Sequence, residues 1–163
     1  MPISTVARSR ILRAVKSTNT KPELILRRAL HSRGFRYRLH SRSLPGRPDL
    51  ALPGRRKVIF VNGCFWHQHP HCSNARLPQT NRGYWLPKLK RNVERDAGNI
   101  AALRKLGWDA LVVWECELAN IQSVLPRVLA FLSDTRLADR GDWAGFDVCW
   151  QLRAGGICGS GRC

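Results

Sequence analysis

The segment GCFWHQHPHC, residues 63–72, is the feature that most constrains how this chain can fold. It holds two cysteines and three histidines within ten residues. Zinc takes four such sulfur and nitrogen ligands in a tetrahedron, and a loop this short rarely supplies all four. Cys116, directly after the apolar run VVWE, is available as a ligand from elsewhere. The cluster therefore predicts a structural zinc site, with unliganded cysteines as the alternative.

The size and termini of the chain favour a single cytosolic domain. Its 163 residues are enough for one domain with a hydrophobic core. The sequence has no run of 18 apolar residues, so we expect no membrane span. The first residues, MPISTVARSR, lack the apolar centre of a secretory signal. In the cytosol, clustered cysteines indicate a metal site rather than disulfides.

Positive charge is concentrated in the first part of the chain. Residues 1–100 carry 21 Lys and Arg residues and four acidic residues, whereas residues 101–163 carry seven of each. The formal net charge is +17, and most of the basic residues are Arg, whose guanidinium matches phosphates and guanine edges. This excess favours a nucleic-acid partner over a generally basic composition.

Local patterns predict a mixed α/β domain. Thr20-Lys-Pro-Glu23 is a capping box that predicts a helix from 21 to about 32. Alternation predicts a strand over 35–40, and PDLALPGRRKVIFVNG predicts two strands joined by Pro-Gly. Residues 73–86 have an irregular pattern, and we expect helices over 87–107 and 119–132 with a buried strand over 108–115 between them. The order predicts a small mixed sheet flanked by helices.

The last 31 residues differ in composition from the rest. Residues 133–163 are rich in Gly, Asp, Arg and Cys, and we expect a poorly packed tail there. We expect Cys149, Cys158 and Cys163 to have no part in the metal site.

Residues 1–100 are strongly basic, so the presence of each of their four acidic residues needs a local explanation. Asp49 follows Pro48 at the start of a strand. In a hairpin-like pair it can lie beside Val61 and Asn62, at the end of the next strand. Asp49 is then either a Mg²⁺ ligand or an aspartate of the turn. The capping box explains Glu23, and pairing with Lys90 explains Glu94. Asp96 could face the same site as Asp49.

Phe65 and Trp66 form an adjacent aromatic pair inside the cysteine and histidine segment. Neighbouring side chains of a strand point to opposite faces, so both rings cannot enter one core face. Insertion between DNA base pairs and ordinary packing are the two interpretations.

Four motifs in this order resemble the very short patch repair (Vsr) endonucleases: SLPGRPDL (43–50), VIFVNGCFWHQHPHC (58–72), KRNVERD (90–96) and LVVWEC (111–116). The resemblance runs from about residue 8 to about 132. It implies a Vsr-like endonuclease domain over residues 1–132, in which residues 1–18 form a basic segment that contacts DNA. It also implies the restriction-endonuclease-like fold, with structural Zn²⁺ and catalytic Mg²⁺.

The activity implied is nicking of one DNA strand 5′ to the T of a T:G mismatch that arises from deamination of 5-methylcytosine, which starts very short patch repair. The partners implied are double-stranded DNA with that mismatch, mismatch-repair proteins and a repair DNA polymerase. We expect a monomer that acts on the nucleoid in a bacterial cytoplasm. Two other functions stay open, a restriction-type endonuclease of the same fold that cuts matched sites and a zinc-dependent DNA-binding module without catalysis.

The resemblance also assigns roles to individual residues. Asp49 and the backbone carbonyl of Val61 would bind Mg²⁺, and His67, Asp96 and Glu23 would be catalytic. The zinc ligands would be Cys64, His69, Cys72 and Cys116. DNA contacts would come from Leu12, Phe65 and Trp66, which wedge into the stack, and from Arg13, Lys90 and Asn92.

The sequence departs from the family at two points. Asn62 stands where some members have His, and Asn cannot titrate near neutral pH, so proton transfer would fall to His67 or to a metal-bound water. The loop is one residue longer before Cys72, so His71 competes with His69 as a zinc ligand, and we prefer His69.

Overall fold

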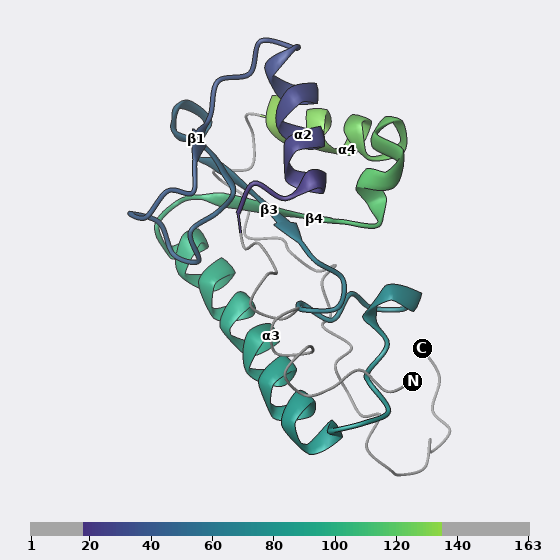
Figure 1. Cartoon of the computed structure of the whole chain (residues 1–163). Coiled ribbons are helices and arrows are strands. Elements are labelled where there is room, and N and C mark those ends of the chain that lie inside the picture. The colour runs from purple at the N-terminus through teal and green to yellow at the C-terminus, as the bar shows by residue number, and fades with distance from the viewer. Residues whose placement is uncertain (1–17, 135–163) are drawn as a thin grey trace, which may run out of the picture.

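The computed structural model describes residues 18–134, which form a four-stranded mixed sheet between helices (Figure 1). The strands are β1 (Arg38–Leu39), β2 (Leu50–Leu52), β3 (Lys57–Asn62) and β4 (Asp109–Trp114), in the spatial order β1-β2-β3-β4. β2 pairs antiparallel with β1 on one side and with β3 on the other, and β3 pairs with β4 in parallel. The predicted mixed sheet flanked by helices is confirmed.

Three α-helices surround the sheet: α2 (Lys21–His31), α3 (Arg82–Lys105) and α4 (Ile121–Ser133). Short 3-10 turns, η1 (Pro53–Arg55), η2 (Ser73–Ala75) and η3 (Glu117–Asn120), lie between the regular elements. Figure 1 shows α2 and α4 together on one side of the sheet, with the long α3 helix on the other side and extending beyond it. No helix within residues 18–134 combines the length and the apolar character needed to cross a membrane.

Alternation along the strands divides the core between the two faces of the sheet. Leu50, Leu52, Ile59 and Val113 pack with apolar residues of α2 and α4, including Leu26, Leu30, Val128 and Leu132. The intervening residues face the other way, where Ala51 and Val58 pack with Leu103 of α3. A period of two is what a sheet covered on both faces requires, and it sets which strand residues point toward each helix layer.

Helix α2 begins where the capping box predicts. Thr20 is its N-cap and accepts a hydrogen bond from the backbone N–H of Glu23 at 3.5 Å, and Pro22 lies in the first turn. The Glu23 carboxylate, however, contacts Arg27 one turn further along α2 and His40 across the fold. The cap therefore explains where the helix starts but not where the carboxylate points.

Two predicted boundaries were wrong. The strand over 35–40 contains just Arg38 and Leu39, because its partner β2 has three residues and is followed by Pro53, which has no N–H to donate. Helix α3 begins at Arg82 rather than 87, so Pro87 lies inside it instead of in its first turn. Pro87 is exposed, and the backbone N–H groups of Tyr84 and Trp85 both donate to the Asn81 carbonyl, which forms the first turn without it.

Candidate active site and metal centre

Four sulfur and nitrogen donors meet beside the end of β4. One ligand atom each from Cys64, His69, Cys72 and Cys116 lies within 4.8 Å of the others. The His69 Nδ1 is 3.6 Å from the Cys64 Sγ and 3.3 Å from the Cys116 Sγ. A tetrahedral zinc ion would set such sulfur–nitrogen separations at about 3.6 Å. The donor set and its spacing therefore fit zinc.

Without a metal, the surroundings shift the pKa values of the four donors in different directions. Burial raises the pKa of the Cys64 thiol to about 12 and also raises that of Cys116. A hydrogen bond from the Asn74 backbone lowers the pKa of Cys72, and burial lowers that of His69, which favours the neutral imidazole that metals bind. The His69 ring stacks on Trp114 with centroids 4.2 Å apart, which fixes its plane.

The loop that carries these donors is tied to the sheet. The Cys64 N–H donates to the Glu115 carboxylate at 2.9 Å, and the His69 N–H donates to the Cys64 carbonyl at 2.9 Å. His71 is exposed, has a φ of +59° and lies outside the four-donor cluster. The geometry therefore supports His69 over His71.

A second cluster lies where β2 begins and β3 ends. Glu23 of α2, His40 after β1 and Asp49 before β2 each place a ligand atom within 4.8 Å of the other two. Glu23 is one of four acidic residues among the first 100, and it is buried, with 1% of its surface exposed. Carboxylate oxygens are the ligands that Mg²⁺ uses in proteins, so this cluster can hold a divalent cation.

Asp49 is held by the backbone of the neighbouring strand. The Val61 N–H donates to the Asp49 Oδ2 at 2.7 Å, which leaves Oδ1 to face His40. Burial raises the pKa of Asp49 to about 6, and the nearby Glu23 charge adds to the rise, whereas the Val61 hydrogen bond, His40 and His67 oppose it. A strongly raised carboxyl pKa with specific charged neighbours is typical of functional sites.

The PGRPD segment positions Asp49 through a tight turn. The Arg47 N–H donates to the Leu44 carbonyl at 3.2 Å, with Pro45 and Gly46 in the centre. Gly46 has a φ of +74°, and a Cβ there would approach the Asn99 side chain of α3 to 2.9 Å. Glycine is therefore required both by the backbone conformation and by the close approach of α3.

His67 and Asp96 form the third element of the site. The His67 Nδ1 lies 2.5 Å from the Asp96 Oδ2, and both side chains are about one quarter exposed. A carboxylate on Nδ1 orients the imidazole and leaves Nε2 for proton transfer. Asn62, the last residue of β3, is buried, and its carbonyl accepts a hydrogen bond from the Glu115 N–H.

The aromatic pair belongs to a larger ring cluster at the start of α3. Phe65 and Trp66 are half-buried, and their ring centroids lie 5.3 and 5.9 Å from that of Trp85. The Lys88 ammonium lies 5.3 to 5.6 Å from the ring centroids of Trp66, Tyr84 and Trp85. The cluster is thus partly open, and a cation lies over it.

The other predicted DNA contacts occupy different environments. Lys90 is exposed and pairs with Glu94 at 3.8 Å, the surface ion pair expected from their spacing. The Asn92 side chain donates to the Trp66 carbonyl at 3.2 Å, so it holds the aromatic loop against α3. Leu12 and Arg13 lie outside the described residues, as do the basic segment 1–17 and residues 135–163.

Comparison with known proteins identifies the family. A family model described as "DNA mismatch endonuclease Vsr" matches residues 3–74. The chain is 44% identical over 126 residues to the type II nicking enzyme V.XorIIP of Xanthomonas oryzae pv. oryzae, covering 77% of this chain and 92% of that protein. It is 39% identical over 141 residues to the DNA mismatch endonuclease Vsr of Escherichia coli, covering 86% of this chain and 90% of that protein.

The chain belongs to the Vsr family. A third relative, the type II nicking enzyme V.NmeAIP of Neisseria meningitidis, is 41% identical over 117 residues, which is 72% of this chain and 83% of that protein. The relatives support a DNA endonuclease, and DNA is its substrate.

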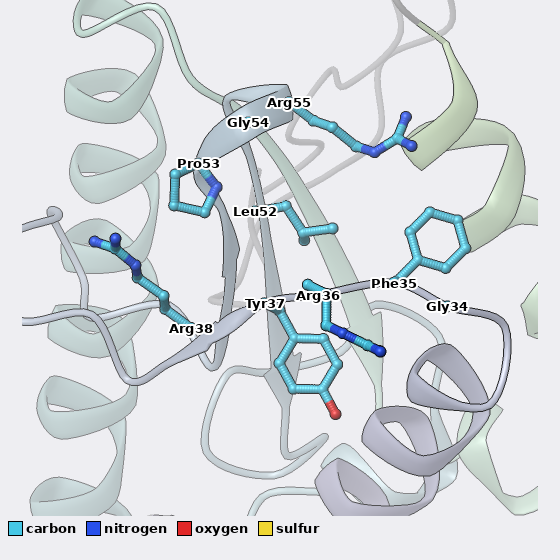
Figure 2. Close-up of a pocket in the computed structure, with 9 residues that line it drawn as sticks. All are labelled: Gly34, Phe35, Arg36, Tyr37, Arg38, Leu52, Pro53, Gly54 and Arg55. Carbon is cyan, nitrogen blue, oxygen red and sulfur yellow. The ribbon is translucent and has the colours of Figure 1, made fainter.

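The pocket in Figure 2 lies away from the acidic residues of this Vsr-family chain. It has a volume of about 500 Å³ and is lined from Gly34 to Arg38 and from Leu52 to Arg55, at the opposite end of β2 from Asp49. Figure 2 shows Arg55 extending toward Phe35, over whose ring its guanidinium lies at 5.4 Å, and Arg55 also donates to the Leu132 carbonyl. None of the residues that line this pocket belongs to the cluster of Glu23, His40 and Asp49.

Sequence reasoning missed two residues of the site. Trp85 completes the ring cluster, but it falls in a segment whose pattern looked irregular; the adjacent pair Tyr84-Trp85 was the available signal. His40 lies between the buried Glu23 and the partly buried Asp49, yet nothing in the local sequence RLHS marks it.

Proposed function

We propose that this Vsr-family endonuclease nicks one strand of double-stranded DNA on the 5′ side of the T in a T:G mismatch, using Mg²⁺. The observation that carries the proposal is the cluster of Glu23, His40 and Asp49, with His67, the partner of Asp96, near enough to lower the pKa of Asp49. A phosphate bound there would meet cation ligands and a base at once.

Asp49 and Glu23 would hold Mg²⁺, with the Val61 carbonyl at the same strand end. When bound, Mg²⁺ neutralises charge on the scissile phosphate and on the leaving 3′ oxygen. His67, oriented by Asp96, takes the proton from the attacking water through Nε2. Asn62 orients water but cannot act as the base. The products are a 3′-OH and a 5′-phosphate.

Zinc would have a structural role in this scheme. Cys64, His69, Cys72 and Cys116 would fill all four positions, which leaves none for substrate. Zinc then fixes the loop that carries Phe65, Trp66 and His67. Native mass spectrometry should detect one zinc ion in the wild-type protein and none in Cys72→Ala, and equal zinc content in the two proteins would contradict this ligand set.

Phe65, Trp66 and, from the segment outside the described residues, Leu12 would open the base stack beside the mismatch. Unstacking costs a few kcal/mol per step, and less at a T:G pair than at its matched neighbours. Arg13 and Lys90 would contact phosphates, and Asn92 would support the wedge through Trp66. The fold would be that of type II restriction endonucleases, acting on DNA as a monomer.

The test is a nicking assay with a strand-labelled duplex panel. Each duplex carries T:G or T:A at the same position, in varied methyltransferase contexts, with Mg²⁺ or EDTA. We expect Mg²⁺-dependent cleavage 5′ to the T in T:G duplexes alone, and none with Asp49→Asn. Equal cleavage of T:A would indicate a restriction-type enzyme, and tight binding without product would indicate a DNA-binding module.

A further inference from the structure

His40 is held between the two acids of the site by its own backbone. It follows β1, has a φ of +46°, and its N–H donates to the Asp49 carbonyl at 3.2 Å. A non-glycine residue at positive φ is uncommon and persists where the surrounding structure enforces it. The ring is thereby directed at Glu23 and Asp49.

Each nitrogen of the His40 ring faces one carboxylate. The Nε2 lies 3.2 Å from the Glu23 Oε1, and the Nδ1 lies 3.8 Å from the Asp49 Oδ1. The other Asp49 oxygen is already engaged by the Val61 N–H. The oxygen that faces His40 is therefore the one free to share a ligand with it.

The His40 Nε2 is buried but makes no hydrogen bond to any residue within 18–134. The Glu23 oxygen is near enough, so the angle rather than the distance prevents the bond. Burial of a polar atom without a partner destabilises a protein, and a water or an ion that is not seen is one explanation for such an atom. A cation between the three side chains would supply that partner.

We propose that His40 is a nitrogen ligand of the divalent cation held by Asp49 and Glu23, which makes this site bind Mn²⁺ more tightly than Mg²⁺. Imidazole nitrogen suits first-row transition ions, whereas Mg²⁺ prefers oxygen alone. The inference rests on the proposed function in that it uses the same cation site. Mg²⁺ would still support nicking, through the carboxylates.

The experiment uses the full chain with its zinc in place. Mn²⁺ is titrated and the free ion is followed by electron paramagnetic resonance, and Mg²⁺ affinity is obtained by competition. We expect His40→Gln to raise the Mn²⁺ dissociation constant about tenfold or more, while Mg²⁺ binding changes much less. His31→Gln is the matched control, because His31 is exposed at the end of α2.

A spectroscopic readout tests the ligand itself. Electron spin echo modulation of the Mn²⁺ complex should show a directly bound nitrogen in the wild type and in His31→Gln, and lose it in His40→Gln and His40→Ala. Unchanged Mn²⁺ affinity and nitrogen coupling in folded His40→Gln would overturn the inference. Circular dichroism of each variant confirms folding, and Gln serves if Ala fails to fold.

The two proposals fail separately. Nitrogen coupling that depends on His40, in a protein that nicks no T:G duplex, would support the ligand and contradict the function. Mismatch nicking with Mn²⁺ binding independent of His40 would do the reverse.

Discussion

Strand β3 has buried charge at both ends, and the two ends balance it differently. At its first residue, the Lys57 ammonium lies 3.9 Å from the Asp109 carboxylate, donates to the Phe131 carbonyl and lies over the Phe131 ring. Beside its last residues, the carboxylates of Glu23 in α2 and of Asp49 before β2 lie close to His40. Burial raises the pKa of the carboxylate at each end, but at the first end Lys57 opposes the rise in the Asp109 pKa, whereas at the second end Glu23 adds to the rise in the Asp49 pKa.

This difference separates a structural ion pair from the proposed cation site. A buried charge with a matched partner joins β3 to α4 and contributes to the fold. Clustered acids that repel one another are retained where function requires them, and they lower stability. Variants at the two ends should therefore have opposite effects on activity and stability.

The largest expected effect is on catalysis at the acidic end. Asp49→Asn keeps an acceptor for the Val61 N–H but removes the charge that would hold Mg²⁺. Single-turnover nicking of a T:G duplex should fall on the order of a thousandfold, since the lost stabilisation of the transition state is several kcal/mol. Duplex binding in a gel-shift assay should persist, and near-normal nicking would remove Asp49 from the mechanism.

At the other end, Lys57→Met should damage the fold and leave the chemistry intact. Removing the ammonium leaves Asp109 without its buried partner, which we expect to cost about 2–4 kcal/mol in urea unfolding. The folded variant should nick at the wild-type rate. Lys90→Met is the control, because the exposed pair with Glu94 contributes less than about 1 kcal/mol; equal losses in the two variants would contradict the assignment.

The pH dependence of stability should distinguish wild type from Asp49→Asn in the absence of divalent cations. Asp49 has a folded pKa of about 6, above its ordinary value of 3.8, so the folded state binds the extra proton. Stability from this group is fully present below pH 4 and is lost as the pH rises through 6, by at most about 3 kcal/mol. The free energy of unfolding of Asp49→Asn, measured by urea titration, should therefore rise relative to that of wild type between pH 4 and 7. A difference between the two proteins that does not change with pH would contradict the raised pKa of Asp49.

A smaller effect is expected at the turn that presents Asp49. Gly46→Ala must adopt a φ of +74° and displace the Asn99 side chain, which should cost about 1–2 kcal/mol. Gly98→Ala, in α3 with open space around its Cβ position, should be neutral or stabilising by about 0.5–1 kcal/mol. Thermal unfolding compares the two, and the reverse ranking would be incompatible with the turn geometry.

The sequence predicted those features that depend on neighbouring residues. The capping box located the start of α2, the two runs joined by Pro-Gly located β2 and β3, and the buried apolar run over 108–115 located β4. The predicted start of α3, at residue 87, was wrong because proline is more often found in the first turn of a helix than in its interior. Only the fold brings Glu23, His40 and Asp49 together, since Glu23 lies in α2, His40 follows β1 and Asp49 precedes β2, and no periodicity relates them.

The zinc-ligand candidates were predictable for the opposite reason. Three of the four lie in one loop, and their chemistry identifies them without any fold. The choice between His69 and His71 needed the structure, because it depends on which ring turns toward Cys116. Trp85 was missed since its partners, Phe65 and Trp66, are about twenty residues away.

The most direct measurement compares the effect of Mg²⁺ on unfolding of wild type, Asp49→Asn and Lys57→Met at pH 8. A cation that binds the folded state alone raises its stability with concentration. We predict that Mg²⁺ stabilises wild type and Lys57→Met to the same extent and has no effect on Asp49→Asn. Equal stabilisation of all three, or of none, would contradict a cation site at the acidic end of β3.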